Sequence, residues 1–178
     1  MLIYQINRVI ESVNKLSKNN KFWIIPVLLV MGIIFYSSAT PYGDQDLRPS
    51  LMSYLPLDAM KPVLEPIDFM YHGKPVNLAS HGPAGLVEFL IRKAAHVTVF
   101  LLLMVTSFLA LHKLTSLRLL PKLGAAFVIT VLYASFDEFH QSLTPDRTPY
   151  IGDVVLDSFG GLIGALLILV IWRFGKRA

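Results

Sequence analysis

Four long apolar runs constrain the fold of this chain more than any other feature of its sequence. They cover about residues 22–39, 94–112, 119–136 and 154–172. An α-helix needs about 20 residues to cross the roughly 30 Å of membrane hydrocarbon, and each run is close to that length. Only 16% of the residues are charged, against about 25% in an average soluble domain. The sequence therefore predicts an all-α integral membrane protein, a bundle of about four transmembrane helices.

Three further segments surround these runs. Residues 1–21 place apolar side chains at helical spacing, which predicts an amphipathic helix on the inner membrane surface or, alternatively, a cytosolic helix packed on the 112–122 loop. The outer loop over residues 40–86 holds most of the prolines but is too apolar for a free linker. We expect short helical pieces there, which either cover the bundle or fill the gap between helices. Residues 22–172 then form one transmembrane domain, followed by a basic tail over residues 173–178.

Lysine and arginine residues are concentrated on one side of the predicted membrane. The N-terminal segment, the 112–122 loop and the C-terminal tail hold ten of the sixteen basic residues. Because basic residues near span ends stay on the inner side, both termini are expected in the cytoplasm. The net charge of +4 does not indicate a nucleic-acid partner, since the basic residues are spread between apolar runs. The absence of cysteine excludes disulfides and thiolate chemistry.

Ionisable side chains lie near the outer ends of three predicted spans. Such groups are costly at membrane depth and usually face the interior of the bundle, so each one is a candidate site residue. Arg92, Lys93 and His96 open the second span, and we expect Arg92 to extend toward the membrane surface. The other candidates close the third span or open the fourth: Asp137, Glu138, His140, Gln141, Arg147, Asp153 and Asp157.

We expect six of these residues to form a polar nest just below the outer surface. Its members are Lys93, His96 and Arg147, facing the carboxylates Glu138, Asp153 and Asp157. A purely structural ion-pair network would leave the same pattern. His96, His140 and the carboxylates are potential metal ligands, but no spacing typical of a metal site is present. Neither a metal nor another cofactor is therefore expected.

Small residues follow Asp157 along its face of the fourth span. Gly160, Gly161 and Gly164 make a stripe that allows another helix to approach closely. Packing within the bundle is the simpler interpretation, and a homodimer through this face is the alternative.

The same residues carry a resemblance to the VanZ-like family of bacterial membrane proteins. The matching elements are Arg92-Lys-Ala-Ala-His96, Phe136-Asp-Glu138-Phe-His-Gln141, Arg147, and Asp153-Val-Val-Leu-Asp157 with the glycines after it. Their order and spacing resemble the family over about residues 25–172. The resemblance assigns the family's polar signature to Lys93, His96, Glu138, Gln141, Arg147 and Asp153. Asp157 departs from it, because the family often has asparagine at this position.

The resemblance implies a multi-pass protein of the bacterial cell membrane with a role in the cell envelope. The segment Tyr36–Tyr42 also resembles members from Gram-positive bacteria. The family is named for reduced susceptibility to the lipoglycopeptide teicoplanin, so glycopeptide-type antibiotic resistance is the expected role.

Two mechanisms are compatible with this role. In the first, a non-catalytic site binds a membrane lipid, a lipid-linked envelope component or the lipoglycopeptide itself. The ligand-binding residues would be Lys93, Asp137, Gln141, Arg147, Asp153 and Asp157, with Lys93 and Arg147 suited to a phosphate or carboxylate. In the second, an intramembrane enzyme modifies such a component, with Glu138 as general acid or base and His96 as its proton-transfer partner. A transporter is less compatible, because four spans leave little room for alternating access.

Overall fold

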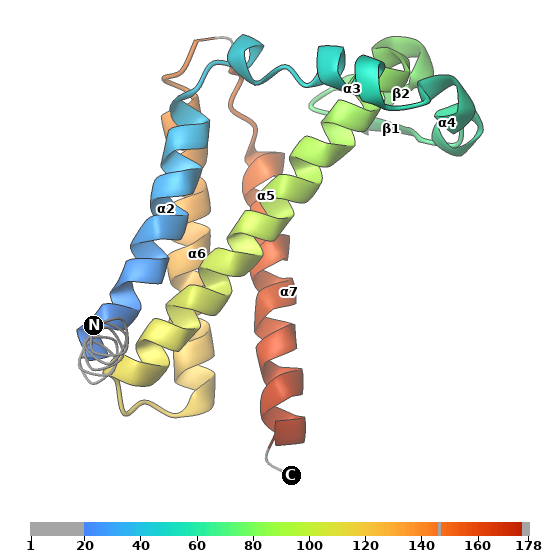
Figure 1. Cartoon of the computed structure of the whole chain (residues 1–178). Coiled ribbons are helices and arrows are strands. Elements are labelled where there is room, and N and C mark those ends of the chain that lie inside the picture. Colours follow the sequence, from blue (N-terminus) through green and yellow to red (C-terminus); the bar gives the residue numbers. More distant parts are fainter. Residues whose placement is uncertain (1–19, 146, 176–178) are drawn as a thin grey trace, which may run out of the picture.

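The computed structural model describes residues 20–145 and 147–175, and these form a bundle of long helices with a smaller cap at one end (Figure 1). The elements in chain order are η1 (Asn20–Trp23), α2 (Ile24–Ala39), η2 (Gly43–Gln45), α3 (Arg48–Tyr54), α4 (Leu57–Leu64), β1 (Asp68–Tyr71), β2 (Lys74–Asn77), α5 (Leu78–Leu114), α6 (Leu119–Gln141) and α7 (Ile151–Gly175). The amphipathic helix predicted for residues 1–21 lies almost wholly outside the described residues, as does half of the basic tail.

Four helical segments in the described part of the chain are long and apolar enough to cross a membrane, as predicted. They are Asn20–Ala39, Leu78–Leu114, Leu119–Gln141 and Ile151–Phe174. Leucine, isoleucine, valine and phenylalanine side chains cover much of their outer surface. Exposing so large an apolar surface to water is unfavourable, whereas contact of this surface with membrane hydrocarbon is not. The protein is therefore a multi-pass membrane protein.

Helix α5 lies at the centre of the bundle and crosses it obliquely, in contact with α2, α6 and α7 (Figure 1). One buried cluster joins α2, α5 and α6 through Ile34, Phe100, Leu103 and Ala134. A second cluster, toward the opposite end of the bundle, includes Met104 and joins α5 to α6 and α7. The polar candidate residues lie beyond the first cluster, at the end of the bundle that carries the cap.

Helix α5 begins at Leu78, not near residue 94 as predicted, so the loop before it is shorter than expected. Asn77 caps the helix by accepting the backbone N–H of Ser80. A kink follows at Gly82, whose φ of 64° suits glycine, before Pro83. The prediction failed because charged residues in this stretch lower its hydropathy, while the pairing of those charges lets the helix continue.

The glycine stripe of α7 packs directly on α5. A Cβ atom added at Gly160 would collide with the backbone carbonyl of Val97. A Cβ atom added at Gly164 would lie 3.1 Å from the carbonyl oxygen of Leu101. The two helix backbones therefore approach closely at these positions, and the face considered for a homodimer is occupied within the chain.

The segment between α2 and α5 contains a β-hairpin as well as short helices, which corrects the all-α expectation. Strands β1 and β2 pair antiparallel, with Tyr71 opposite Lys74. The two turn residues, His72 and Gly73, both have positive φ, as a tight two-residue hairpin turn requires. The hairpin and α4 pack on the first part of α5 around buried Val76. This cap brings the turn residues to the polar end of the bundle.

Candidate functional site

A cavity of about 570 Å³ lies at the capped end of the bundle. Side chains from α2, α5, α6, the hairpin and the residues around the start of α7 line it. Six of the eight predicted site residues are among them: Lys93, His96, Asp137, Gln141, Arg147 and Asp153. Glu138 and Asp157 are not part of the lining formed by the described residues. The structure thus brings most of the candidates from three distant segments to one cavity.

Lys93 and Asp153 form an ion pair between α5 and the first turn of α7. The Tyr71 hydroxyl donates a hydrogen bond to the same carboxylate, and the Lys93 ammonium lies 4.4 Å from the centre of the Tyr71 ring. Burial and then the hydrogen bond to Asp153 raise the pKa of the Tyr71 hydroxyl. The hairpin is in this way fastened to both α5 and α7.

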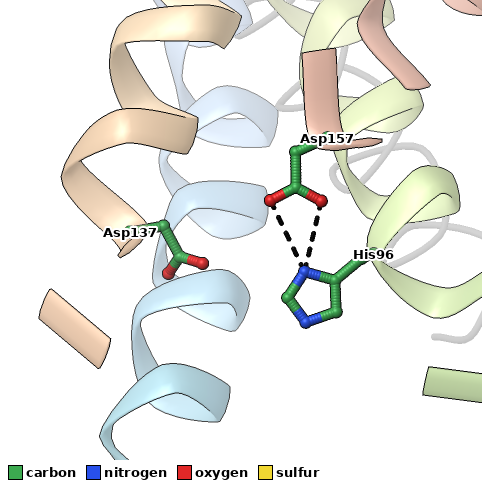
Figure 2. Close-up of side chains that lie close together, drawn as sticks. All are labelled: His96, Asp137 and Asp157. Atoms are coloured by element: carbon green, nitrogen blue, oxygen red, sulfur yellow. Dashed lines mark hydrogen bonds and ion pairs between the residues drawn. The ribbon is translucent and has the colours of Figure 1, made fainter. Parts of the chain in front are cut away.

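His96, Asp137 and Asp157 converge from α5, α6 and α7 (Figure 2). The Nδ1 atom of His96 lies 3.2 and 3.5 Å from the two carboxylate oxygens of Asp157. The carboxylate of Asp137 lies beside this pair, and one potential ligand atom from each residue falls within 4.8 Å of the other two. Asp137 and Asp157 are 2% and 1% exposed. Two carboxylates are therefore buried next to one imidazole.

Hydrogen bonds from two neighbours orient Asp137. The Ser38 hydroxyl of α2 donates to one carboxylate oxygen, and the Gln141 amide donates to the other at 2.8 Å. The Gln141 oxygen in turn accepts a bond from the Arg147 guanidinium at 3.4 Å. This chain of contacts links the buried carboxylate to the cation on the loop before α7.

Arg147 is held by oxygen atoms at the end of α2 and in the loop after it. Its Nη2 atom donates to the carbonyl of Thr40 at 3.1 Å and to the side-chain oxygen of Gln45 at 3.2 Å. Its Nε atom is buried and has no hydrogen-bond partner among the described residues. Burial lowers the pKa of Arg147, but an arginine still carries its charge at neutral pH. The guanidinium thus lines the cavity without a carboxylate partner among the described residues.

Glu138 is bonded to the backbone and not to a cation of the predicted polar nest. Its carboxylate accepts the backbone N–H of Tyr150, the residue before α7 begins, and the residue is 8% exposed. It forms no ion pair within residues 20–145 and 147–175. An acid at this place satisfies an N–H group near a helix N-terminus, which is a favourable location for negative charge. The arrangement joins the end of α6 to the start of α7.

A second charged group at the cavity, centred on Glu88, was not predicted. Glu88 is 1% exposed and pairs with Arg92 at 2.9 Å, one turn later on α5. It also accepts bonds at 3.1 Å from the Tyr42 hydroxyl and from the backbone N–H of Leu47. Arg92 lies 4.3 Å from the centre of the Tyr42 ring and also donates to Gln45, so its guanidinium is directed toward the loop after α2. The opposite charges of Glu88 and Arg92 at i,i+4 spacing were the signal available in the sequence.

The cavity as a whole is amphipathic. Four cationic side chains line it, namely Arg48, Arg92, Lys93 and Arg147, against three carboxylates, namely Glu88, Asp137 and Asp153. Apolar lining residues lie one turn further along the same helices. Ile34 precedes Ser38 on α2 by four residues, and Phe100 follows His96 on α5 by four. A charged region is therefore continuous with an apolar region directed toward the middle of the membrane.

Comparison with known proteins gives one family. The family model described as VanZ/LLP1 matches residues 23–173, which cover nearly all of the four candidate membrane-spanning helices and every candidate site residue. No curated protein and no solved structure matches the chain significantly. Since the family model covers most of the chain, the protein belongs to the VanZ/LLP1 family.

Proposed function

We propose that the cavity binds the anionic headgroup of a lipid-linked or amphiphilic envelope component, and that this binding lowers susceptibility to teicoplanin-type lipoglycopeptides. Family membership links the chain to VanZ-like proteins associated with antibiotic resistance. The proposal adds a ligand class and a location to that general role.

The amphipathic lining of the cavity is the observation that carries this proposal. Four cationic side chains outnumber the three carboxylates of the lining. The Arg147 guanidinium lines the cavity and donates only to neutral oxygen atoms, so within the described residues no carboxylate neutralises its charge. Arginine binds such groups through parallel hydrogen bonds that are stronger than neutral ones.

The apolar part of the lining supports an amphiphilic ligand over a free anion. Ile33, Ile34, Val99 and Phe100 extend the cavity toward the centre of the membrane. An acyl or polyprenyl chain placed there would be removed from water, at about 0.8 kcal/mol for each buried CH₂ group. A free phosphate would gain nothing from this surface.

The proposed site faces the outside of a bacterial cell membrane, with both termini in the cytoplasm. The start of the described chain, just before α2, and the last turn of α7 both lie at the end of the bundle away from the cap (Figure 1). The exposed bases near that end, such as Arg118, favour its location on the inner side. The cavity would then open where lipid-linked wall components and lipoglycopeptides are present.

Catalysis by Glu138 and His96 has less support. Glu138 is outside the described cavity lining and is engaged by a backbone N–H group, so it does not share the cavity with His96. A general acid or base must reach its substrate within hydrogen-bond distance. Binding without chemical change is therefore the function that the geometry supports best.

A binding measurement in lipid nanodiscs tests the proposal. Teicoplanin and a polyprenyl phosphate are titrated separately onto the wild type, Arg147→Gln and Arg118→Gln. Arg118 is exposed at the opposite end of the bundle, so its substitution changes the net charge equally without touching the cavity. We expect saturable binding of at least one ligand, weakened about tenfold or more by Arg147→Gln, the typical effect of losing a charged hydrogen bond.

The susceptibility of a host expressing the same variants gives the second readout. Arg147→Gln should lose protection against teicoplanin at matched membrane levels, and Arg118→Gln should retain it. Susceptibility to a glycopeptide without an acyl chain is measured as well. This comparison distinguishes recognition of the drug from recognition of a cell-wall component. Absence of saturable binding by the wild type, or equal binding by both variants, would refute the proposal.

A further inference from the structure

Three potential metal ligands from three different helices meet beside the cavity, as Figure 2 shows for His96, Asp137 and Asp157. We propose that these side chains bind a divalent transition-metal ion such as Zn²⁺ or Mn²⁺. This goes beyond the proposed function, which requires no metal. It also departs from the expectation drawn from sequence spacing, because the ligands are 41 and 20 residues apart along the chain, which leaves no local motif.

The distances are close to those of a metal site. Zinc binds nitrogen and carboxylate oxygen at about 2.0–2.2 Å, which places tetrahedral ligand atoms roughly 3.5 Å apart. His96 Nδ1 and the nearer oxygen of Asp157 are already 3.2 Å apart, and all three ligand atoms lie within 4.8 Å of one another. A small movement of the Asp137 side chain toward the other two would complete the set.

Charge and burial favour a cation at this position. Asp137 and Asp157 are 2% and 1% exposed, and within the described residues neither forms an ion pair with lysine or arginine. His96 is the one basic side chain in the cluster. Burying two carboxylates together is costly unless positive charge accompanies them. A divalent ion would neutralise both.

The surroundings of Asp137 resemble the support that metal-bound carboxylates receive. Ser38 donates to one of its oxygens and Gln141 to the other, and Arg147 donates to Gln141. Each carboxylate oxygen retains a lone pair for a metal. Outer hydrogen bonds of this kind fix the orientation of metal ligands and strengthen binding.

The cluster is open on one side. His96 and Asp137 both line the cavity, whereas Asp157 lies behind them, outside the described lining. Three protein ligands with an open position are typical of metal sites that also bind water or a substrate oxygen. One imidazole with two carboxylates suits Zn²⁺, Mn²⁺ or Fe²⁺, because Mg²⁺ prefers oxygen ligands alone.

Metal binding is measured on the full chain in detergent, purified through a tag without histidine and stripped with a chelator. Zn²⁺, Mn²⁺ and Mg²⁺ chlorides are titrated separately by calorimetry, and bound metal is counted by mass spectrometry. We expect about one Zn²⁺ or Mn²⁺ per chain, with Mg²⁺ binding much more weakly. The variants His96→Gln, Asp137→Asn and Asp157→Asn should each weaken binding about tenfold or more.

Asp58→Asn is the matched control. Its side chain is 94% exposed on α4 and lies outside the cluster, so this variant should bind metal as the wild type does. Unchanged binding in all three cluster variants would overturn the proposal, as would preferential binding of Mg²⁺ or no binding at all.

A measurement on the wild type alone keeps the proposal testable if the cluster variants do not fold. Pulsed electron paramagnetic resonance of the Mn²⁺-loaded protein detects nitrogen bound directly to the metal. We expect the signal of one imidazole; a spectrum without bound nitrogen would overturn the assignment. These readouts do not depend on an amphiphilic ligand, so failure of the proposed function and failure of the metal site are distinguishable.

Discussion

Lys93 on α5 and Asp153 in the first turn of α7 form an ion pair beside the cavity, although 60 residues separate them in the chain. Their side chains are 23% and 17% exposed, so water screens the pair only partly. The Tyr71 hydroxyl donates to the same carboxylate. One contact point thus joins the hairpin, the central helix and the last helix.

The two members of this pair should be energetically coupled. Lys93→Met and Asp153→Asn each leave a partly buried partner without its counter-ion, at a cost of roughly 1–3 kcal/mol. The double variant should lose less than the sum of the two, because both charges are then absent. Thermal unfolding in detergent measures this cycle. Additive losses would show that the pair contributes no coupling.

Glu88→Gln should be among the more damaging single substitutions at the cap. The carboxylate is 1% exposed and accepts bonds from Arg92, Tyr42 and the backbone of Leu47, so the change removes the counter-ion of a part-buried arginine. Breaking such a pair costs about 3–5 kcal/mol. Glu65→Gln, at an exposed position after α4, is the control and should unfold like the wild type. Equal unfolding temperatures for both variants would contradict the assigned role of Glu88.

Stability should fall as the pH rises above about 10, the ordinary pKa of tyrosine. Burial raises the pKa of the Tyr71 hydroxyl in the folded protein. Below pH 10 the hydroxyl is protonated in both states; above it, the unfolded chain loses the proton first and is favoured.

Replacing Tyr71 by phenylalanine removes this contribution. Tyr71→Phe should therefore lose stability less steeply between pH 9 and pH 11 than the wild type, by at most about 1.4 kcal/mol per pH unit. Tyr54→Phe, at a position 85% exposed on α3, should retain the wild-type slope. Thermal unfolding across this pH range makes the comparison, and identical slopes for all three proteins would refute it.

Gly160 should not tolerate a methyl group. Its added Cβ would collide with the carbonyl oxygen of Val97, and backbone cannot move aside as a flexible side chain can. Gly160→Ala should lower stability by about 1–3 kcal/mol, as overpacking does. Gly32→Ala is the matched control: it lies within α2 with nothing within 4 Å of the added Cβ, and should be neutral or slightly stabilising. Equal stability of the two variants would contradict the close packing of α5 and α7.

Hydropathy predicted the four spans because it depends on the length and composition of each apolar run and not on which residues contact that run in the folded protein. The same property misplaced the start of α5. Glu88, Arg92 and Lys93 reduce the hydropathy of the stretch, and their partners in space cannot be read from a window of residues. The hairpin was missed for a related reason, since each strand has four residues and β2 contains Pro75.

The candidate site could be predicted in outline because ionisable groups within apolar spans are costly and therefore informative. Which of these groups pair with one another could not be predicted from the sequence. Asp137 accepts a hydrogen bond from the hydroxyl of Ser38, 99 residues away in the chain. This contact depends on how α2 and α6 are rotated toward each other. Glu138 precedes Gln141 by three residues, yet the structure directs Glu138 to the backbone of Tyr150 and Gln141 to the cavity.

Substitution of Glu138 separates ligand binding from acid–base catalysis. Glu138→Gln keeps an oxygen that can accept the N–H of Tyr150, so the junction between α6 and α7 should survive with a loss of about 1–2 kcal/mol. Because the described cavity lining does not include Glu138, protection against teicoplanin should stay within a few-fold of the wild type at equal membrane levels. Glu138→Ala removes the acceptor and should lower the amount of folded protein. If a well-folded Glu138→Gln protein lost protection completely, the function would need proton transfer by this carboxyl group. That outcome would favour an enzyme.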